Sequence, residues 1–174
     1  HFPNRKADRQ SPIVGPNSEY VELVIVGLGT DPDNSGALRR WLDNWGLPVV
    51  VTPKVKGIVD ETGSNFVGTI GGMAADGLIL EALGSADLVI GFGFDPVEHD
   101  GTWFADAEIL WVLEAPNVGG LVPDGTELVD HADLLGVLAE QEPPSRWEAP
   151  FRDVQERRLA LLDDRPEVGD TMWQ

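Results

Sequence analysis

Two pairs of glycines that accompany apolar runs are the residues of this chain best placed for chemistry. Gly27 and Gly29 follow one run and precede a predicted helix, and Gly91 and Gly93 close another. Such glycines let the backbone approach a bound phosphate, and a G-x-G after a buried strand begins a dinucleotide-binding fingerprint. The third glycine of that fingerprint is missing, because Pro32 stands there. The pattern therefore fits either a contact with a nucleotide phosphate or a plain strand-to-helix turn.

Glu114 stands at the end of a further apolar run. A carboxylate at the carboxyl end of a parallel strand can accept hydrogen bonds from ribose hydroxyls. The alternative interpretation is a solvated surface acid, and the sequence leaves both open.

Residues for catalysis or metal binding do not form a known pattern. Glu98 and His99 could be a catalytic pair or part of a solvated loop, and no Ser or Cys stands in a nucleophile elbow. The run Asp31–Gly36 resembles the start of a calcium loop, but Leu42 at the twelfth position cannot supply the carboxylate. The three histidines are scattered and cysteine is absent, which argues against a transition-metal site. We predict no catalytic residue and no metal ligand.

Composition and charge exclude several classes of function. The chain has 174 residues, 42% of them apolar, with 20 glycines and 13 prolines, as in a globular, loop-rich protein. Thirty acidic and 12 basic residues give a net charge of −18, which would repel a nucleic-acid backbone. The excess fits either a protein adapted to high salt or an ordinary acidic one. No apolar run is long enough for a membrane span, and the lack of cysteine fits the cytoplasm.

Continuous apolar runs and helical apolar stripes predict the elements that position these residues. Buried strands are predicted at 22–28, 48–52, 88–92 and 109–113, with weaker candidates at 118–122 and 126–129. Helices are predicted at 36–45, ended by Gly46, at 74–83, ended by Gly84, from Asp130 to about Ala139, and at 151–162. The segment 53–65 reads as an irregular connection. Strand and helix alternate from 22 to 140, so the predicted class is α/β with a parallel sheet.

From about Tyr20 to Gln141 the chain resembles the central domain of thiamine-diphosphate-dependent enzymes. The family pattern is matched, in order, at Val24–Gly29, Trp45–Val50, Lys56–Gly57, Gly68–Gly71 and Ala86–Gly91. Two later segments, Gly93–Asp100 and Leu121–Leu128, are most similar to acetolactate synthases of the catabolic type.

The resemblance implies a fold and a division of the chain. The implied fold is a three-layer, Rossmann-like domain of the type that binds NAD or FAD, with a mostly parallel six-stranded sheet. Residues 1–19 are then an extended arm, 20–141 the central domain, and 142–174 a linker and helix towards a pyrophosphate-binding domain. Because the chain begins with His1 rather than Met, we expect a piece of a longer protein.

In this family the chemistry belongs to the flanking domains. The pyrimidine-binding domain carries the catalytic Glu, and the pyrophosphate-binding domain carries the G-D-G…N motif for Mg²⁺ and thiamine diphosphate. Pro123–Thr126 has the wrong first residue for that motif. The resemblance therefore implies that this chain alone is not an enzyme, whereas its parent is. It also implies that the flanking domains are its partners and that the parent is a homo-oligomer.

The central domain of some family members binds FAD or an ADP-containing ligand, and in others the site is empty. Members that bind FAD usually carry an Arg near the second glycine turn, where this chain has Phe94-Asp95-Pro96. Asp95 and Glu98 would also repel a diphosphate. With Gly71 added from the family pattern, the candidate cofactor-binding residues are Gly27, Gly29, Gly71, Gly91, Gly93 and Glu114.

Two functions from different classes follow. The first is a non-catalytic central domain of an acetolactate synthase-like enzyme that decarboxylates or ligates 2-oxo acids, with a nucleotide cleft that is empty. The second is a stand-alone regulatory module that binds FAD, ADP or NAD. A third, an NAD-consuming enzyme of similar fold, lacks a catalytic Lys or His in a fitting context.

Overall fold

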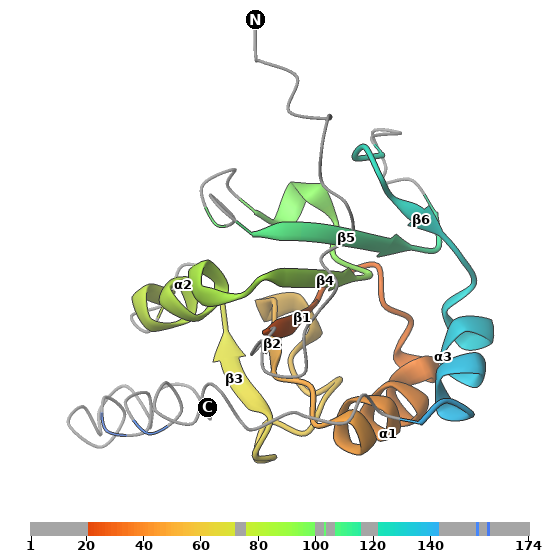
Figure 1. Cartoon of the computed structure of the whole chain (residues 1–174), viewed down its shortest axis with the longest axis horizontal. Coiled ribbons are helices and arrows are strands. Elements are labelled where there is room, and N and C mark those ends of the chain that lie inside the picture. The colour runs from red at the N-terminus through yellow and green to blue at the C-terminus, as the bar shows by residue number, and fades with distance from the viewer. Residues whose placement is uncertain are drawn as a thin grey trace, which may run out of the picture.

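Six parallel strands form the centre of the molecule (Figure 1). The computed structural model describes residues 21–71, 76–99, 103, 107–115, 122–142, 156 and 160. The strands are β1 Glu22–Val26, β2 Val49–Val51, β3 Phe66–Thr69, β4 Leu88–Phe92, β5 Glu108–Leu113 and β6 Glu127–Leu128. Their order is β3-β2-β1-β4-β5-β6, and every neighbouring pair is parallel. The predicted α/β class and parallel, Rossmann-like sheet are confirmed.

The order of the strands places a topological switch point between β1 and β4. From β1 the chain proceeds outward to β2 and β3, and it then returns to β4 on the other side of β1. The chain therefore leaves β1 towards β2 on one side of this point and leaves β4 towards β5 on the other. In open α/β sheets this is the position where ligands bind.

Within the described residues, three α-helices of more than one turn cover the two faces of the sheet. They are α1 Ser35–Trp45, α2 Asp76–Ser85 and α3 His131–Ala139. Helices α1 and α3 lie side by side on one face, and α2 covers the other (Figure 1). Single-turn helices η1 Pro32–Asn34, η2 Pro53–Val55 and η3 Pro96–Glu98 lie in the loops that follow β1, β2 and β4.

The apolar run of β1 is buried on both faces, as a central parallel strand requires. Leu23 and Ile25 pack in the core under α2, whereas Val24 and Val26 pack in the core under α1 and α3. Side chains alternate between the faces of a strand, so a continuous apolar run supplies both cores.

The predicted helix ends are correct for α1 and α3. Gly46 follows α1 in the left-handed conformation, with φ of 61°, which glycine adopts without steric cost. Asp130 caps α3, because its Oδ1 accepts a hydrogen bond from Asp133 N at 2.9 Å. The segment Asp31–Gly36, which resembles the start of a calcium loop, contains η1 and the first residues of α1.

The sequence pattern missed one strand and misplaced one glycine. Gly68 lies inside β3, a strand that was not predicted, and pairs with Val50. Gly91 lies inside β4, whose bounds match the strand predicted at 88–92. Gly84 does not end α2, which continues to Ser85. Glycine is tolerated inside β3 and β4 because packing against the neighbouring strands overrides its low strand propensity.

Several predictions concern residues outside the described part of the chain. They are the arm 1–19, most of the weak strand 118–122, the start of the predicted helix 74–83, and most of the helix 151–162, of which Glu156 and Ala160 are described and helical. The weak strand 126–129 is confirmed as β6. None of the helices in the described residues is long and apolar enough to cross a membrane.

Candidate functional site

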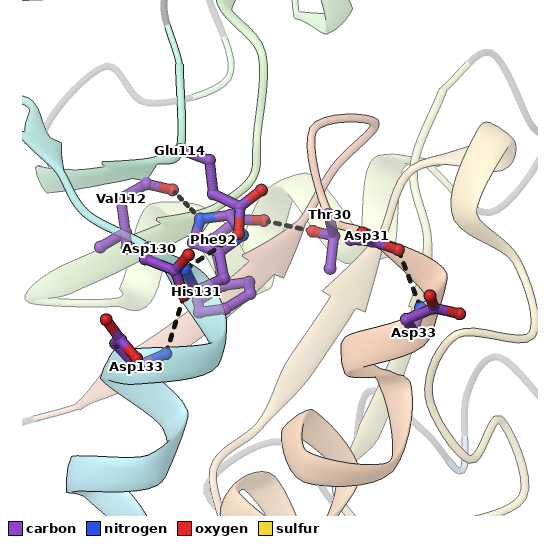
Figure 2. A network of polar contacts seen from close by, with 9 residues as sticks. All are labelled: Thr30, Asp31, Asp33, Phe92, Val112, Glu114, Asp130, His131 and Asp133. Carbon is purple, nitrogen blue, oxygen red and sulfur yellow. Dashed lines mark hydrogen bonds and ion pairs between the residues drawn. The ribbon is translucent and has the colours of Figure 1, made fainter.

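The loops that follow β1 and β4 are bonded to each other at the switch point. Gly27 N donates to Phe92 O at 3.1 Å, and Gly29 N donates to Gly93 O at 2.7 Å. The buried hydroxyl of Thr30 also donates to Phe92 O, at 3.2 Å (Figure 2). Because of these hydrogen bonds, backbone atoms of the two loops lie in direct contact.

Three of the predicted glycines make this approach possible. A Cβ on Gly27 would lie 2.5 Å from Phe94 Cα, and one on Gly29 would lie 3.0 Å from Gly93 O. Gly93 has φ of 56°, and a Cβ there would lie 2.6 Å from Thr30 N. Glycine is therefore needed at these turns for contact between the loops, whether or not a ligand binds.

The carboxylate of Glu98 lies against the turn that follows β1. Its Oε2 accepts hydrogen bonds from Leu28 N at 2.7 Å and from Asp95 N at 3.2 Å. Its Oε1 accepts from the hydroxyl of Thr52, just beyond β2, at 2.7 Å. The N–H between the two glycines, which in a dinucleotide-binding fold faces a phosphate, is thus occupied by an acid of the chain itself.

The local sequence explains how Glu98 reaches this place. Asp95 is the N-cap of η3 and Pro96 follows it, a combination that starts a helical turn. The Asp95 carboxylate accepts from Val97 N at 2.9 Å, and Glu98 reaches back to Asp95 N, so the two acids form a capping box. The capping box turns Glu98 towards β1 and β2.

Glu98 and His99 are not brought together as a catalytic pair. The His99 ring lies against Phe94 and Trp111, with ring centroids 5.6 and 5.7 Å away, whereas Glu98 is bonded to Leu28, Asp95 and Thr52. The solvated-loop interpretation is also wrong for Glu98, because this side chain is half-buried and has three donors.

The remaining candidates are dispersed. Gly71 follows β3, and a Cβ there would lie 2.6 Å from Pro53 Cγ. Gly91 pairs with Ile25 and Trp111 inside the sheet. The structure therefore brings Gly27, Gly29 and Gly93 together and leaves Gly71 and Gly91 outside that cluster. A role for any of them in cofactor binding stays a prediction.

Glu114 lies at the end of β5, beside the N-terminus of α3 (Figure 2). Its Oε1 accepts a hydrogen bond from His131 N at 2.9 Å and lies 3.6 Å from His131 Nδ1. Its side chain is 36% exposed. Glu114 therefore caps α3 in this structure, and its predicted bond to a ribose remains untested.

His131 is the buried titratable group of this site, and sequence reasoning dismissed it. Its ring is fully buried, lies tilted against the Phe92 ring at a centroid distance of 4.2 Å, and has Nε2 3.2 Å from Val112 O. A carbonyl only accepts, so Nε2 carries the ring proton and Nδ1 is left without a hydrogen bond. Burial lowers the pKa of His131, although Val112 O and the nearby carboxylates of Glu114 and Asp130 oppose the shift.

Among the residues that the structure describes, no three His, Cys, Asp or Glu side chains lie together where they could hold a metal ion. The signal for Glu98 was present in the spacing of Asp95, Pro96 and Glu98, which is typical of a capping box. His131 carried no such signal, since one histidine after an N-cap residue predicts nothing about burial.

A comparison with curated proteins finds no match. The sequence model of the central domain of thiamine pyrophosphate enzymes matches residues 20–117. That match spans more than half of the chain and contains β1 to β5 with the closed switch point. The chain therefore belongs to the family of thiamine pyrophosphate enzyme central domains.

Proposed function

We propose that this chain is the non-catalytic central domain of an acetolactate synthase-like enzyme. The parent decarboxylates a 2-oxo acid on thiamine diphosphate and can join the product to a second carbonyl. Membership of the family supports the domain assignment. The segments Gly93–Asp100 and Leu121–Leu128, which resemble catabolic acetolactate synthases, support the narrower one.

One observation carries the proposal that the domain is architectural. At the switch point, the groups that would face a nucleotide phosphate are bonded within the chain: Gly29 N to Gly93 O, and Leu28 N to the Glu98 carboxylate. A bound diphosphate would have to break these bonds and approach a carboxylate of the same charge. The domain accordingly contributes packing and subunit contacts rather than a working nucleotide site.

The cofactor of the parent belongs to its other domains in this proposal. The described residues offer no donor set that fits Mg²⁺, and thiamine diphosphate is held through that metal in the family pattern. We place residues 1–19 in an arm, 20–141 in the central domain, and 142–174 in the link to a pyrophosphate-binding domain. We also propose that the flanking domains of the parent hold the cofactor, that the parent is a homo-oligomer, and that it is located in the cytoplasm.

Calorimetric titration of the 174-residue chain with FAD, ADP and NAD tests the architectural role. We expect no saturable heat from any of the three, at low salt or at high salt. High salt is included because the charge of −18 weakens the approach of any anion when it is unscreened. Micromolar binding of one nucleotide would overturn the proposal and favour the alternative, a regulatory nucleotide-binding module.

A further inference from the structure

Three hydrogen-bond donors, two of them from distant parts of the chain, converge on the carboxylate of Glu98. They are Leu28 N after β1, Asp95 N at η3, and the Thr52 hydroxyl after β2. Leu28 and Thr52 are 70 and 46 residues from Glu98 in the sequence. The arrangement therefore belongs to the fold and is not a local turn of η3.

The site is built tightly around an oxygen atom. A Cβ on Gly27 would lie 2.4 Å from Glu98 Oε2, so only glycine lets this oxygen reach Leu28 N. Thr52 is 1% exposed, and its hydroxyl is thus a buried donor that needs an acceptor. Because both carboxylate oxygens accept hydrogen bonds here, a group that replaces the carboxylate must offer at least two acceptor oxygens.

We infer that these donors form an oxyanion site that the chain fills with its own carboxylate, and that Glu98 is the residue that excludes phosphate-bearing ligands from the switch point. This inference rests on the proposed function, because it explains why an intact G-x-G turn binds no nucleotide. A phosphate likewise offers two or more acceptor oxygens on one central atom, and two anions cannot share the donors.

The site is open to solvent on one side. Leu28 is 45% exposed and Glu98 is half-buried. A small oxyanion can therefore enter once the Glu98 side chain is shortened, without movement of the bonded loops. None of the three donors is a Lys or Arg, so binding depends on fixed N–H and O–H groups and is moderate in strength.

Inorganic phosphate is the probe that tests this inference, with Glu98→Ala as the variant and Glu98→Gln as its matched control. Glu98→Ala removes the carboxylate and leaves the donors unfilled. Glu98→Gln keeps the side chain in place, because its amide oxygen still accepts from the N–H groups and its amide NH₂ donates to the Thr52 hydroxyl. The two variants thus separate occupancy of the site from its charge.

Phosphate binding is measured by calorimetry at constant ionic strength, and the amide signals of Leu28 and Asp95 are followed by NMR. We expect Glu98→Ala to bind phosphate at least about tenfold more tightly than the wild type, with movement of both signals. Glu98→Gln is expected to bind as weakly as the wild type. A folded Glu98→Ala that gains no affinity, or a Glu98→Gln that gains as much, would overturn the inference.

Two additions keep the test decisive. If Glu98→Ala does not fold, Glu98→Ser provides the same space with a side chain too short to reach Leu28 N. The wild type is titrated with ADP in the same buffers. If the wild type does not bind ADP and the variants gain no affinity for phosphate, only the role of Glu98 is rejected. If the wild type binds ADP, the proposed function is rejected as well.

Discussion

Glu98 and Glu114 each accept a backbone N–H at the carboxyl end of the sheet, yet their surroundings differ. The Glu98 carboxylate receives two N–H groups and the buried Thr52 hydroxyl, all of which donate. Glu114 receives one N–H, from His131, and faces the same residue's Nδ1, which has no proton in the neutral ring. One carboxylate is surrounded by donors, and the other meets an acceptor.

The difference separates a fixed region from a region that responds to pH. Donors on both oxygens hold Glu98, and with it the loop after β4, against β1 and β2. The pair of Glu114 and His131 lacks a proton between Oε1 and Nδ1, and burial of the ring opposes its addition. The β1/β4 side should therefore dominate stability, and the β5/α3 side should dominate its pH dependence.

Gly93→Ala is expected to produce the largest effect on stability. The added Cβ would lie 2.6 Å from Thr30 N, at a φ of 56°, so it both strains the backbone and separates the bonded loops. We expect a loss of about 3 kcal/mol in the free energy of unfolding. Gly125→Ala is the matched control, since φ there is 80° but nothing lies within 4 Å of the added Cβ.

Gly125→Ala should cost only the backbone strain, about 1 kcal/mol. Urea unfolding of both variants gives the two values directly. Equal losses would show that the contact between the loops contributes nothing beyond the strain, and the fixed character of the β1/β4 side would be rejected.

The two glutamates compared above give the second prediction. Glu98→Ala should lower the free energy of unfolding by about 2 kcal/mol, because it leaves the buried Thr52 donor without its acceptor. Glu114→Ala should cost less than about 1 kcal/mol, since one N–H near solvent is exposed to water instead. Urea unfolding at neutral pH measures both, and an equal or reversed order would contradict the comparison.

The pH dependence of stability should depend on His131. Its pKa is lowered in the folded state by burial, while the unfolded ring protonates near its ordinary value of about 6.5. The neutral ring thus stabilises the fold above about pH 6.5, and this contribution is lost as the pH falls below it. One proton limits the slope to about 1.4 kcal/mol per pH unit.

His131→Phe keeps the ring contact with Phe92 and removes the titration. Unfolding is followed from pH 7.5 to 5.5 in both proteins, and the two curves are subtracted. Glu22, whose pKa burial raises, and the other acids that do not interact with His131 contribute equally to both proteins and cancel, so the difference reports His131 together with its neighbours Glu114 and Asp130. Parallel curves for the wild type and the variant would mean that His131 does not carry the pH dependence.

The clearest strand predictions rested on unbroken apolar runs, whereas the strand that was missed, β3, is defined by its neighbour. An unbroken run such as Leu23–Val26 identifies β1 without any partner. In β3, Gly68 interrupts a short apolar run, and the register with β2 shifts between Val49 and Val50. Only the pairing itself makes that segment a strand, and pairing between segments is not written in a local pattern.

In the candidate site, too, the features with a local sequence signal were predicted, and the contacts between distant segments were not. The positions of Gly27, Gly29 and Gly93 were predicted because glycine after a strand is a local signal. Their physical reason is tertiary, since each is needed by a loop from the neighbouring strand. The Glu98 capping box was readable from its spacing, but its bonds to Leu28 and Thr52 cross 70 and 46 residues and required the fold.

Gly136→Ala should have the smallest effect and the opposite sign. Gly136 lies on the exposed side of α3, and an added Cβ meets nothing within 4 Å outside the backbone of that helix. Alanine loses less backbone entropy than glycine in a helix, so we expect a gain of about 0.5–1 kcal/mol in the free energy of unfolding.

The comparison of the two regions is sharpened when Gly136→Ala is also made in the Glu98→Ala background. If the β1/β4 side and α3 are independent, the gain is the same there, to within about 0.5 kcal/mol. A smaller gain in that background would show that Glu98 also supports α3, and the two regions would have to be treated as one.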